Sequence, residues 1–144
     1  MLIAIVGPMW SGKEELARVL EEEFNREALV INSYHSVGLF SLCVDHPEDE
    51  ILFVDLDIPK DACWRRAQEA GVGKISFDTV YNYTSRHPDD FKLESEDSIL
   101  KSVKFTADVS VEEIAELVDE LLVKMQWRKE HPDEAEELEG KAEA

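Results

Sequence analysis

The sequence predicts an α/β fold of three layers, in which a parallel sheet of about five strands is flanked by helices. Short apolar runs alternate with helical patterns along the chain, which is the order typical of a parallel sheet. The first run, Leu2 to Val6, is continuous rather than alternating, as in a central strand buried on both faces. We expect one domain over residues 1–130, followed by an acidic tail over 131–144.

The first half of the chain shows a strand, a glycine-bearing turn and a helix, in that order. After the turn, apolar residues recur at helical spacing: Leu16, Val19, Leu20 and Phe24. Residues 28–31 are predicted to form a second strand. The apolar segment 37–44 is expected to be helical and to end before His46-Pro47.

The middle of the chain predicts a buried strand over 51–56 and a helix after it. Pro59 suits the first turn of that helix because its fixed φ and missing N–H are harmless there. Gly71 suits the end of the helix. We expect a short strand over 73–77 and then an aperiodic loop or lid over 78–98.

The last predicted strand covers residues 104–109, and a long helix follows it. Ser110 and Glu113 match a capping box, in which each side chain accepts a hydrogen bond from a backbone N–H at the start of the helix. One apolar face then runs through the helix and predicts that it packs on the sheet: Val111, Ile114, Ala115, Val118, Leu121, Leu122 and Met125.

Composition and charge limit the classes of function. A formal net charge of -18 opposes binding to nucleic acids, which depends on Lys and Arg contacts with phosphates. The apolar runs are too short to cross a bilayer and no signal peptide is apparent, so we expect a cytoplasmic protein without a membrane partner. Cys43 and Cys63 lack metal-ligand spacing and are expected to be reduced core thiols. The acidic C-terminal end is either a solubilising tail or a docking surface for a basic protein partner.

Residues 7–13 match the G-x-x-x-x-G-K core of the Walker A motif, and they lie between a predicted strand and a predicted helix as the motif requires. They are Gly7, Pro8, Met9, Trp10, Ser11, Gly12 and Lys13. The backbone N–H groups of such a turn and the positive end of the following helix suit phosphate oxygens. Lys13 is expected to reach the β- and γ-phosphates of a nucleoside triphosphate. Trp10 lies either over the nucleotide or against the core beneath the loop.

Two carboxylates are candidate ligands for Mg²⁺. Glu14 stands where the motif ordinarily has a Ser or Thr whose hydroxyl binds the metal. It can hold Mg²⁺ directly, or it can repel the phosphates at a cost of about 1 to 4 kcal/mol for unit charges about 4 Å apart. Asp55 ends the apolar run that begins at Ile51, in the form of a Walker B motif, and would hold Mg²⁺ through water or orient a substrate.

Phosphoryl transfer also needs positive charge near the transferred group, and three arginines are candidates. Arg65 and Arg66 are neighbours on a predicted helix and point in different directions, so at most one of them is expected to face the site. Arg86 lies in the predicted lid.

Three segments together resemble the P-loop kinases of small molecules, a group that includes nucleoside monophosphate kinases and shikimate and gluconate kinases. Residues 1–20 carry the glycine-bearing loop. Residues 53–59, followed by Arg65 or Arg66, look like the strand, D-x-P turn and arginine-bearing helix that precede the lid of such kinases. Residues 108–122 are similar to their closing strand and helix.

This resemblance implies a phosphotransferase that uses ATP and Mg²⁺ and acts on a small acceptor, which we expect to be a nucleotide or nucleoside. The short segment 32–50 leaves little room for the helical acceptor-binding insert of these kinases. A second hypothesis is therefore a catalytically degenerate nucleotide-binding protein that acts through a protein partner. A third, a small switch-type NTPase, lacks a second motif for base recognition and a residue placed to orient water.

Overall fold

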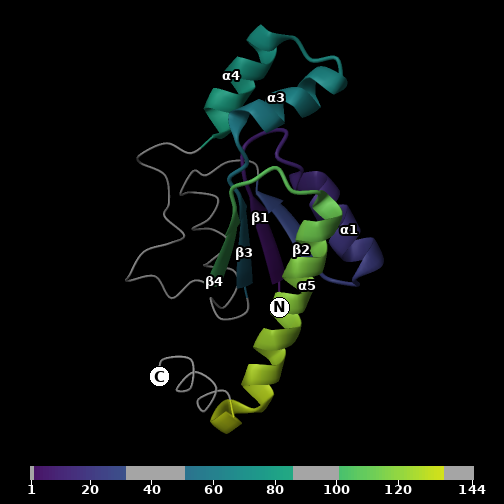
Figure 1. The fold of residues 1–144 in the computed structure, drawn as a ribbon, viewed down its shortest axis with the longest axis vertical. Coiled ribbons are helices and arrows are strands. Elements are labelled where there is room, and N and C mark those ends of the chain that lie inside the picture. The colour runs from purple at the N-terminus through teal and green to yellow at the C-terminus, as the bar shows by residue number, and fades with distance from the viewer. Residues whose placement is uncertain (1, 32–50, 86–100, 135–144) are drawn as a thin grey trace.

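The computed structural model describes residues 2–31, 51–85 and 101–134, which form an α/β fold around a parallel sheet (Figure 1). In chain order the elements are β1 (Leu2–Val6), α1 (Lys13–Glu23), β2 (Ala28–Ile31), β3 (Ile51–Leu56), α3 (Lys60–Glu69), α4 (Lys74–Thr84), β4 (Lys101–Phe105) and α5 (Val111–Glu130). The α/β class and the parallel sheet flanked by helices are confirmed as predicted from the sequence.

All strands of the described sheet are parallel, in the order β2-β1-β3-β4. The two central strands β1 and β3 are buried almost throughout, as their continuous apolar runs predict. In the register between them, Val6 pairs with Asp55. Because the strands run in parallel, the residues that follow β1 and β3 emerge at the same edge of the sheet.

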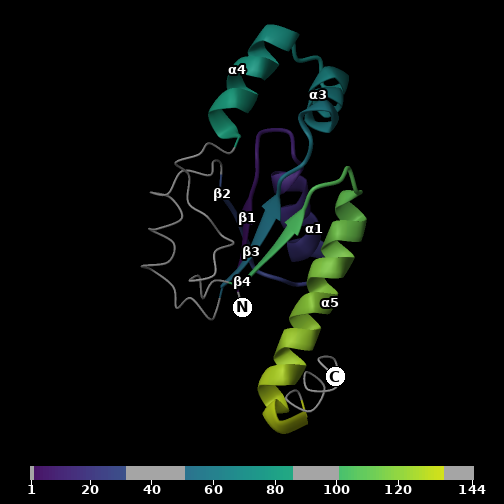
Figure 2. The same cartoon turned by 60° about the vertical axis from the view of Figure 1, so that its left-hand side comes forward.

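Helices α1 and α5 lie side by side on one face of the sheet (Figures 1 and 2). Their apolar side chains and alternate residues of the central strands form the core: Ile3, Ile5, Leu16, Leu20, Leu52, Val54, Ile114 and Val118. Arg26, which follows α1, forms an ion pair of 2.8 Å with Asp119 of α5. Ala4 and Phe53 alternate with the core residues and are also fully buried, so both faces of the central strands are covered.

The α3–α4 hairpin extends beyond the carboxyl ends of the strands, next to the loop that connects β1 to α1 (Figures 1 and 2). Its turn contains Gly71 in the left-handed region, with φ at 83°. Phe77 of α4 is fully buried. Its ring centroid lies 5.3 Å from that of Trp64 and 5.5 Å from that of Tyr81, so an aromatic cluster joins the two helices.

Two predicted strands differ from the structure. Residues 73–77 are not a strand, since Lys74 to Thr84 forms helix α4. Phe77 and Tyr81 are four residues apart, a spacing that brings both rings to one helix face against α3. The last strand covers Lys101–Phe105 rather than 104–109, because its pairing with β3 ends at Leu56 opposite Phe105.

The other predictions are met in part. The described ranges contain four strands rather than about five, and the predicted loop over 78–98 is helical as far as Thr84. The helix expected over 59–70 is confirmed as α3, with Pro59 directly before it. The predicted helix over 37–44 and residues 86–98 of the predicted lid lie outside the described residues. Within the described ranges, no helix has the length and hydrophobicity needed to span a membrane.

The N-terminus of α5 shows half of the predicted capping box. The Ser110 hydroxyl accepts a hydrogen bond from the Glu113 N–H at 3.2 Å. We expect Ser110→Ala to lower the free energy of unfolding by about 1 kcal/mol, because this N–H then loses its acceptor. Ser110→Asp keeps an acceptor and should unfold close to wild type in urea titrations followed by circular dichroism. Equal losses in both variants would contradict a capping role.

Candidate functional site

Residues 7–13 connect β1 to α1, and we call them the glycine loop. Gly12 is the N-cap residue of α1 and has φ at 95°, a left-handed conformation that favours glycine. Gly7 is needed for a different reason. A Cβ atom there would lie 2.7 Å from the Leu56 carbonyl oxygen and 2.8 Å from Ser11 Oγ. The end of β3 and the start of the glycine loop are therefore in direct contact.

Trp10, in the middle of the glycine loop, has an unusual backbone conformation. Its φ is 69°, in the left-handed region that residues other than glycine seldom adopt. The Trp10 side chain is partly buried and packs against the core. The structure shows contact of this ring with the core, and a position over the nucleotide stays a prediction.

Lys13 begins α1, yet its side chain is only 1% exposed. Its Nζ donates hydrogen bonds to the carbonyl oxygens of Gly7 at 2.8 Å and Pro8 at 2.9 Å. Burial lowers the pKa of Lys13 below its ordinary value, while the nearby Glu14 carboxylate acts in the opposite direction. An ammonium group has three protons, so one donor remains for a ligand beyond these two carbonyls.

The first turn of α1, which begins at Lys13, also presents backbone hydrogen-bond donors. The N–H groups of Gly12, Lys13 and Glu14 donate no hydrogen bond to another described residue, and α1 has no side-chain cap. Ser11 is 1% exposed, and its Oγ has no hydrogen-bond partner among the described residues. Unpaired N–H groups at a helix N-terminus, beside a lysine ammonium, suit an anion with several oxygens.

The two predicted metal ligands differ in their surroundings. Asp55 is 3% exposed and lies near the end of β3, opposite Val6 and so beside the start of the glycine loop. Glu14 is exposed in the first turn of α1. Among the described residues, no group of three or more His, Cys, Asp or Glu side chains is arranged to hold a metal ion.

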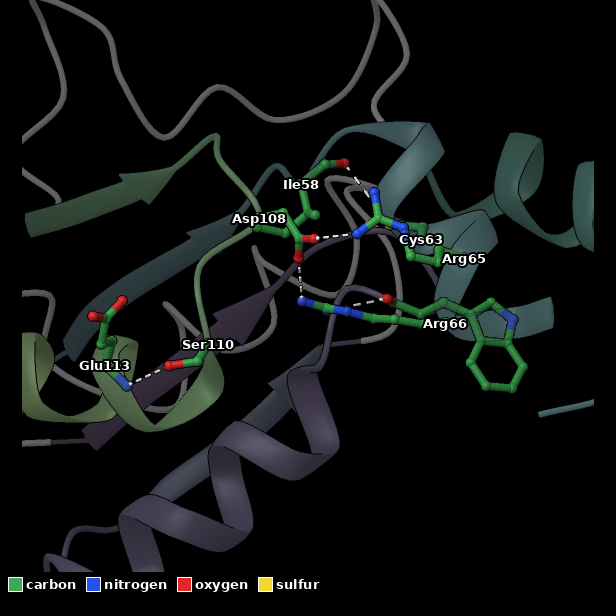
Figure 3. A network of polar contacts seen from close by, with 8 residues as sticks. Ile58, Cys63, Arg65, Arg66, Asp108, Ser110 and Glu113 are labelled. Atoms are coloured by element: carbon green, nitrogen blue, oxygen red, sulfur yellow. Dashed lines mark hydrogen bonds and ion pairs between the residues drawn. The ribbon is translucent and has the colours of Figure 1, made fainter. Parts of the chain in front are cut away.

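Both neighbouring arginines of α3 bind one carboxylate (Figure 3). Arg65 Nη1 lies 3.2 Å from Asp108 Oδ2, and Arg66 Nη2 lies 3.0 Å from Asp108 Oδ1. Arg66 also donates through Nη1 to the Trp10 carbonyl of the glycine loop, at 3.3 Å. Arg66 is thus the one of the pair that contacts the loop, but both side chains, which the sequence predicted to point in different directions, converge on Asp108. The third candidate, Arg86, lies outside the described residues.

The sequence did not point to two residues that contact or flank the site. Thr84, the last residue of α4, accepts a hydrogen bond from the Met9 N–H at 2.8 Å, although 75 positions separate the two. Asp108 follows β4 and binds both arginines. Neither residue belongs to a motif. The folding of α4, which replaces a predicted strand and loop, is what brings Thr84 to the glycine loop.

The close approach at Gly7 gives a stability test. We expect Gly7→Ala to lower the free energy of unfolding by about 1 to 3 kcal/mol, because the new methyl group meets a backbone carbonyl that has little room to move. Gly73→Ala is the control, since nothing lies within 4 Å of a Cβ there and its φ is -75°. Urea unfolding of the two variants should separate them, and equal stability would contradict the contact.

Cys63 offers a test of burial close to the two arginines. Burial raises the pKa of its thiol to about 11, although Arg66 and Lys13 oppose the shift. The folded state therefore holds the thiol proton over the pH range in which the unfolded chain releases it. In a Cys43→Ala background, alkylation by iodoacetamide at pH 8 should be about a hundredfold slower in the native protein than in urea, and should accelerate as the pH approaches 11. Mass spectrometry measures both rates, and similar rates would contradict the burial of Cys63.

A scan against protein-family models finds no family that matches the chain, and a search of curated proteins finds no match.

Proposed function

We propose that the chain binds a nucleoside triphosphate through the glycine loop and transfers its terminal phosphate to a small acceptor, in the manner of a nucleoside monophosphate kinase. The observation that carries the proposal is that one loop holds both the Lys13 ammonium, bonded to the Gly7 and Pro8 carbonyls, and the N–H groups of Gly12 to Glu14, which have no partner among the described residues. Positive charge and convergent N–H donors are the chemistry that recognises a polyphosphate. The Walker A pattern of residues 7–13 supports the same ligand.

In this proposal, different groups of the glycine loop bind different parts of the triphosphate. The Gly12, Lys13 and Glu14 amides hold one phosphate group by hydrogen bonds. The third proton of the Lys13 ammonium reaches the terminal phosphate, while the Gly7 and Pro8 carbonyls fix the direction of the side chain. Ser11 Oγ, buried and without a hydrogen-bond partner in the described part of the chain, is available as a further donor in the same loop.

Mg²⁺ that arrives with the nucleotide needs only one or two protein carboxylates, because phosphates and water complete its coordination. Asp55 and Glu14 are the residues that would hold it, Asp55 from the end of β3 and Glu14 from the first turn of α1. When bound, the metal neutralises part of the charge on the transferred group. The proposal therefore does not require a metal site in which the protein supplies every ligand.

Arg66 and Arg65 lie at the side of the glycine loop and supply positive charge in this proposal. Both are paired with Asp108, at 3.0 and 3.2 Å. Arg65 and Asp108 are exposed, so their ion pair is easy to exchange for a phosphate, whereas Arg66 is half-buried. The acceptor would then approach over α3, on the side from which the arginines reach the loop.

A second candidate is a nucleotide-binding protein that performs no transfer and acts through a protein partner. Two observations favour it. Glu14 places a carboxylate beside the phosphate site, and Asp108 already neutralises both arginines of α3. The acidic C-terminal end is the candidate docking surface in this alternative.

Calorimetric titration of ATP, with and without Mg²⁺, tests the shared part of both candidates, and GTP is titrated in parallel. A scan of nucleotide, nucleoside and small-alcohol acceptors for ADP release then separates them. The transferase predicts ADP release that depends on one acceptor. Binding without turnover supports the second candidate, and no saturable binding at millimolar nucleotide would reject both.

A further inference from the structure

Two side chains of the α3–α4 hairpin form hydrogen bonds with the backbone of the glycine loop. Thr84 accepts a hydrogen bond from the Met9 N–H at 2.8 Å, and Arg66 donates to the Trp10 carbonyl at 3.3 Å. The contacts fall on consecutive residues of the loop, and each comes from a different helix of the hairpin. The loop thus has its backbone fixed at two points by residues far away in the sequence.

The Thr84 hydroxyl is oriented for this contact. It donates its single proton to the Val80 carbonyl oxygen at 2.9 Å, one helical turn earlier. Its lone pairs then remain to accept from the Met9 N–H. Thr84 is 5% exposed, so water has little access to replace it as an acceptor. A valine at this position would have nearly the same shape but no acceptor.

Arg66 is likewise oriented by a second contact, with Asp108. Asp108 binds Arg66 Nη2 at 3.0 Å (Figure 3). This leaves Nη1 to donate to the Trp10 carbonyl. The same Nη1 would lie 3.1 Å from a Cβ atom on Gly12. The guanidinium therefore lies against the glycine loop at both Trp10 and Gly12.

These contacts determine which amides of the glycine loop are available. The Met9 N–H is used by Thr84, and the Ser11 N–H is used by the Pro8 carbonyl at 3.2 Å. Between them, Trp10 is kept in the left-handed conformation. The amides of Gly12 to Glu14 are left without a described partner.

We propose that Thr84 and Arg66 are positioning residues, through which the α3–α4 hairpin holds the glycine loop in the conformation that presents the Gly12 to Glu14 amides to a phosphate. The consequence for nucleotide affinity rests on the proposed function, whereas the hold on the loop itself does not. The experiment therefore has one arm without nucleotide and one arm with it.

The first arm measures amide hydrogen exchange at Met9 by NMR in the absence of nucleotide. Thr84→Val should speed exchange at Met9 by about tenfold or more, because the amide loses its acceptor and opens more readily. Thr84→Ser restores the hydroxyl and should restore slow exchange. Thr79→Val is the matched control, since within the described ranges the Thr79 hydroxyl bonds to the Ile75 carbonyl of its own helix and not to the glycine loop. Unchanged exchange at Met9 in Thr84→Val would overturn the proposal.

Arg66 provides a second variant, which changes a residue of α3 rather than of α4. In a background of Trp64→Phe and Trp127→Phe, Trp10 is the remaining tryptophan and reports on the loop by fluorescence. Arg66→Gln should shift its emission, and Arg66→Lys should shift it less. Arg18→Gln, which removes an exposed ion pair on α1, should leave the emission unchanged. Equal spectra for wild type and Arg66→Gln would overturn the role of Arg66.

The second arm measures the dissociation constant of ATP by calorimetry. Thr84→Val should weaken binding by about tenfold, and Thr84→Ser should bind as wild type does. Equal affinity in wild type and Thr84→Val would overturn the proposed link to the nucleotide. If the wild type binds no ATP while exchange at Met9 responds as expected, the proposed function fails and the positioning of the loop stands.

Discussion

Lys13→Met should weaken ATP binding by about a hundredfold or more. The substitution would remove the charge-assisted hydrogen bond that we propose between the third Lys13 proton and the terminal phosphate, which contributes about 1.5 to 3 kcal/mol. The methionine side chain keeps most of the buried apolar volume of the lysine stem, so the core beneath the loop should remain filled. Isothermal titration calorimetry of wild type and variant, at the same salt concentration, gives the two dissociation constants.

The effect must be separated from a loss of stability, because Lys13 is 1% exposed and its Nζ bonds to Gly7 and Pro8. Thermal unfolding of the variant in the absence of nucleotide provides that check. Lys124→Met, on the exposed side of α5, is the control for the loss of one positive charge. A folded Lys13→Met variant that binds ATP as tightly as wild type would contradict the proposed site.

Phe77→Ala should lower the free energy of unfolding by about 3 to 5 kcal/mol. Phe77 is fully buried in α4, with its ring against Trp64 and Tyr81. Removing it leaves a cavity between α3 and α4 and also loses the aromatic contacts. For a domain of ordinary stability, such a loss is a large part of the whole free energy of unfolding.

Ile75→Ala is the matched control, two residues away on the same helix. Ile75 is 84% exposed, so its truncation should change stability by no more than about 0.5 kcal/mol. Urea unfolding followed by circular dichroism compares the two variants. A cost for Phe77→Ala as small as that for Ile75→Ala would contradict the packing of α4 against α3.

The candidate site could be predicted from sequence only where its residues are neighbours in the chain. Gly7, Gly12 and Lys13 lie within one loop, and a strand before it and a helix after it follow from local apolar patterns. The reason why position 7 requires glycine could not be read from these local patterns. It is the approach of the Leu56 carbonyl, which depends on the pairing of β1 with β3.

The partners of Arg65 and Arg66 show the same limit. Helix geometry predicts that these neighbours point in different directions, yet both side chains bind Asp108, and of the two it is Arg66 that donates to the Trp10 carbonyl. Their common binding to Asp108, more than 40 positions away, depends on where the turn after β4 passes α3. No periodicity or motif carries that information.

By itself, the sequence determined the α/β class, the buried central strands, the glycine loop and the helices that follow Gly12 and Pro59, because each depends on short-range patterns of apolar residues, glycine and proline. Only the tertiary structure decided that residues 74–84 are helical and that Thr84 and Arg66 contact the glycine loop. The physical reason is that the aromatic residues of this segment fit either a strand or a helix. Packing of Phe77 between Trp64 and Tyr81 selects the helix, and the helix carries Thr84 to Met9.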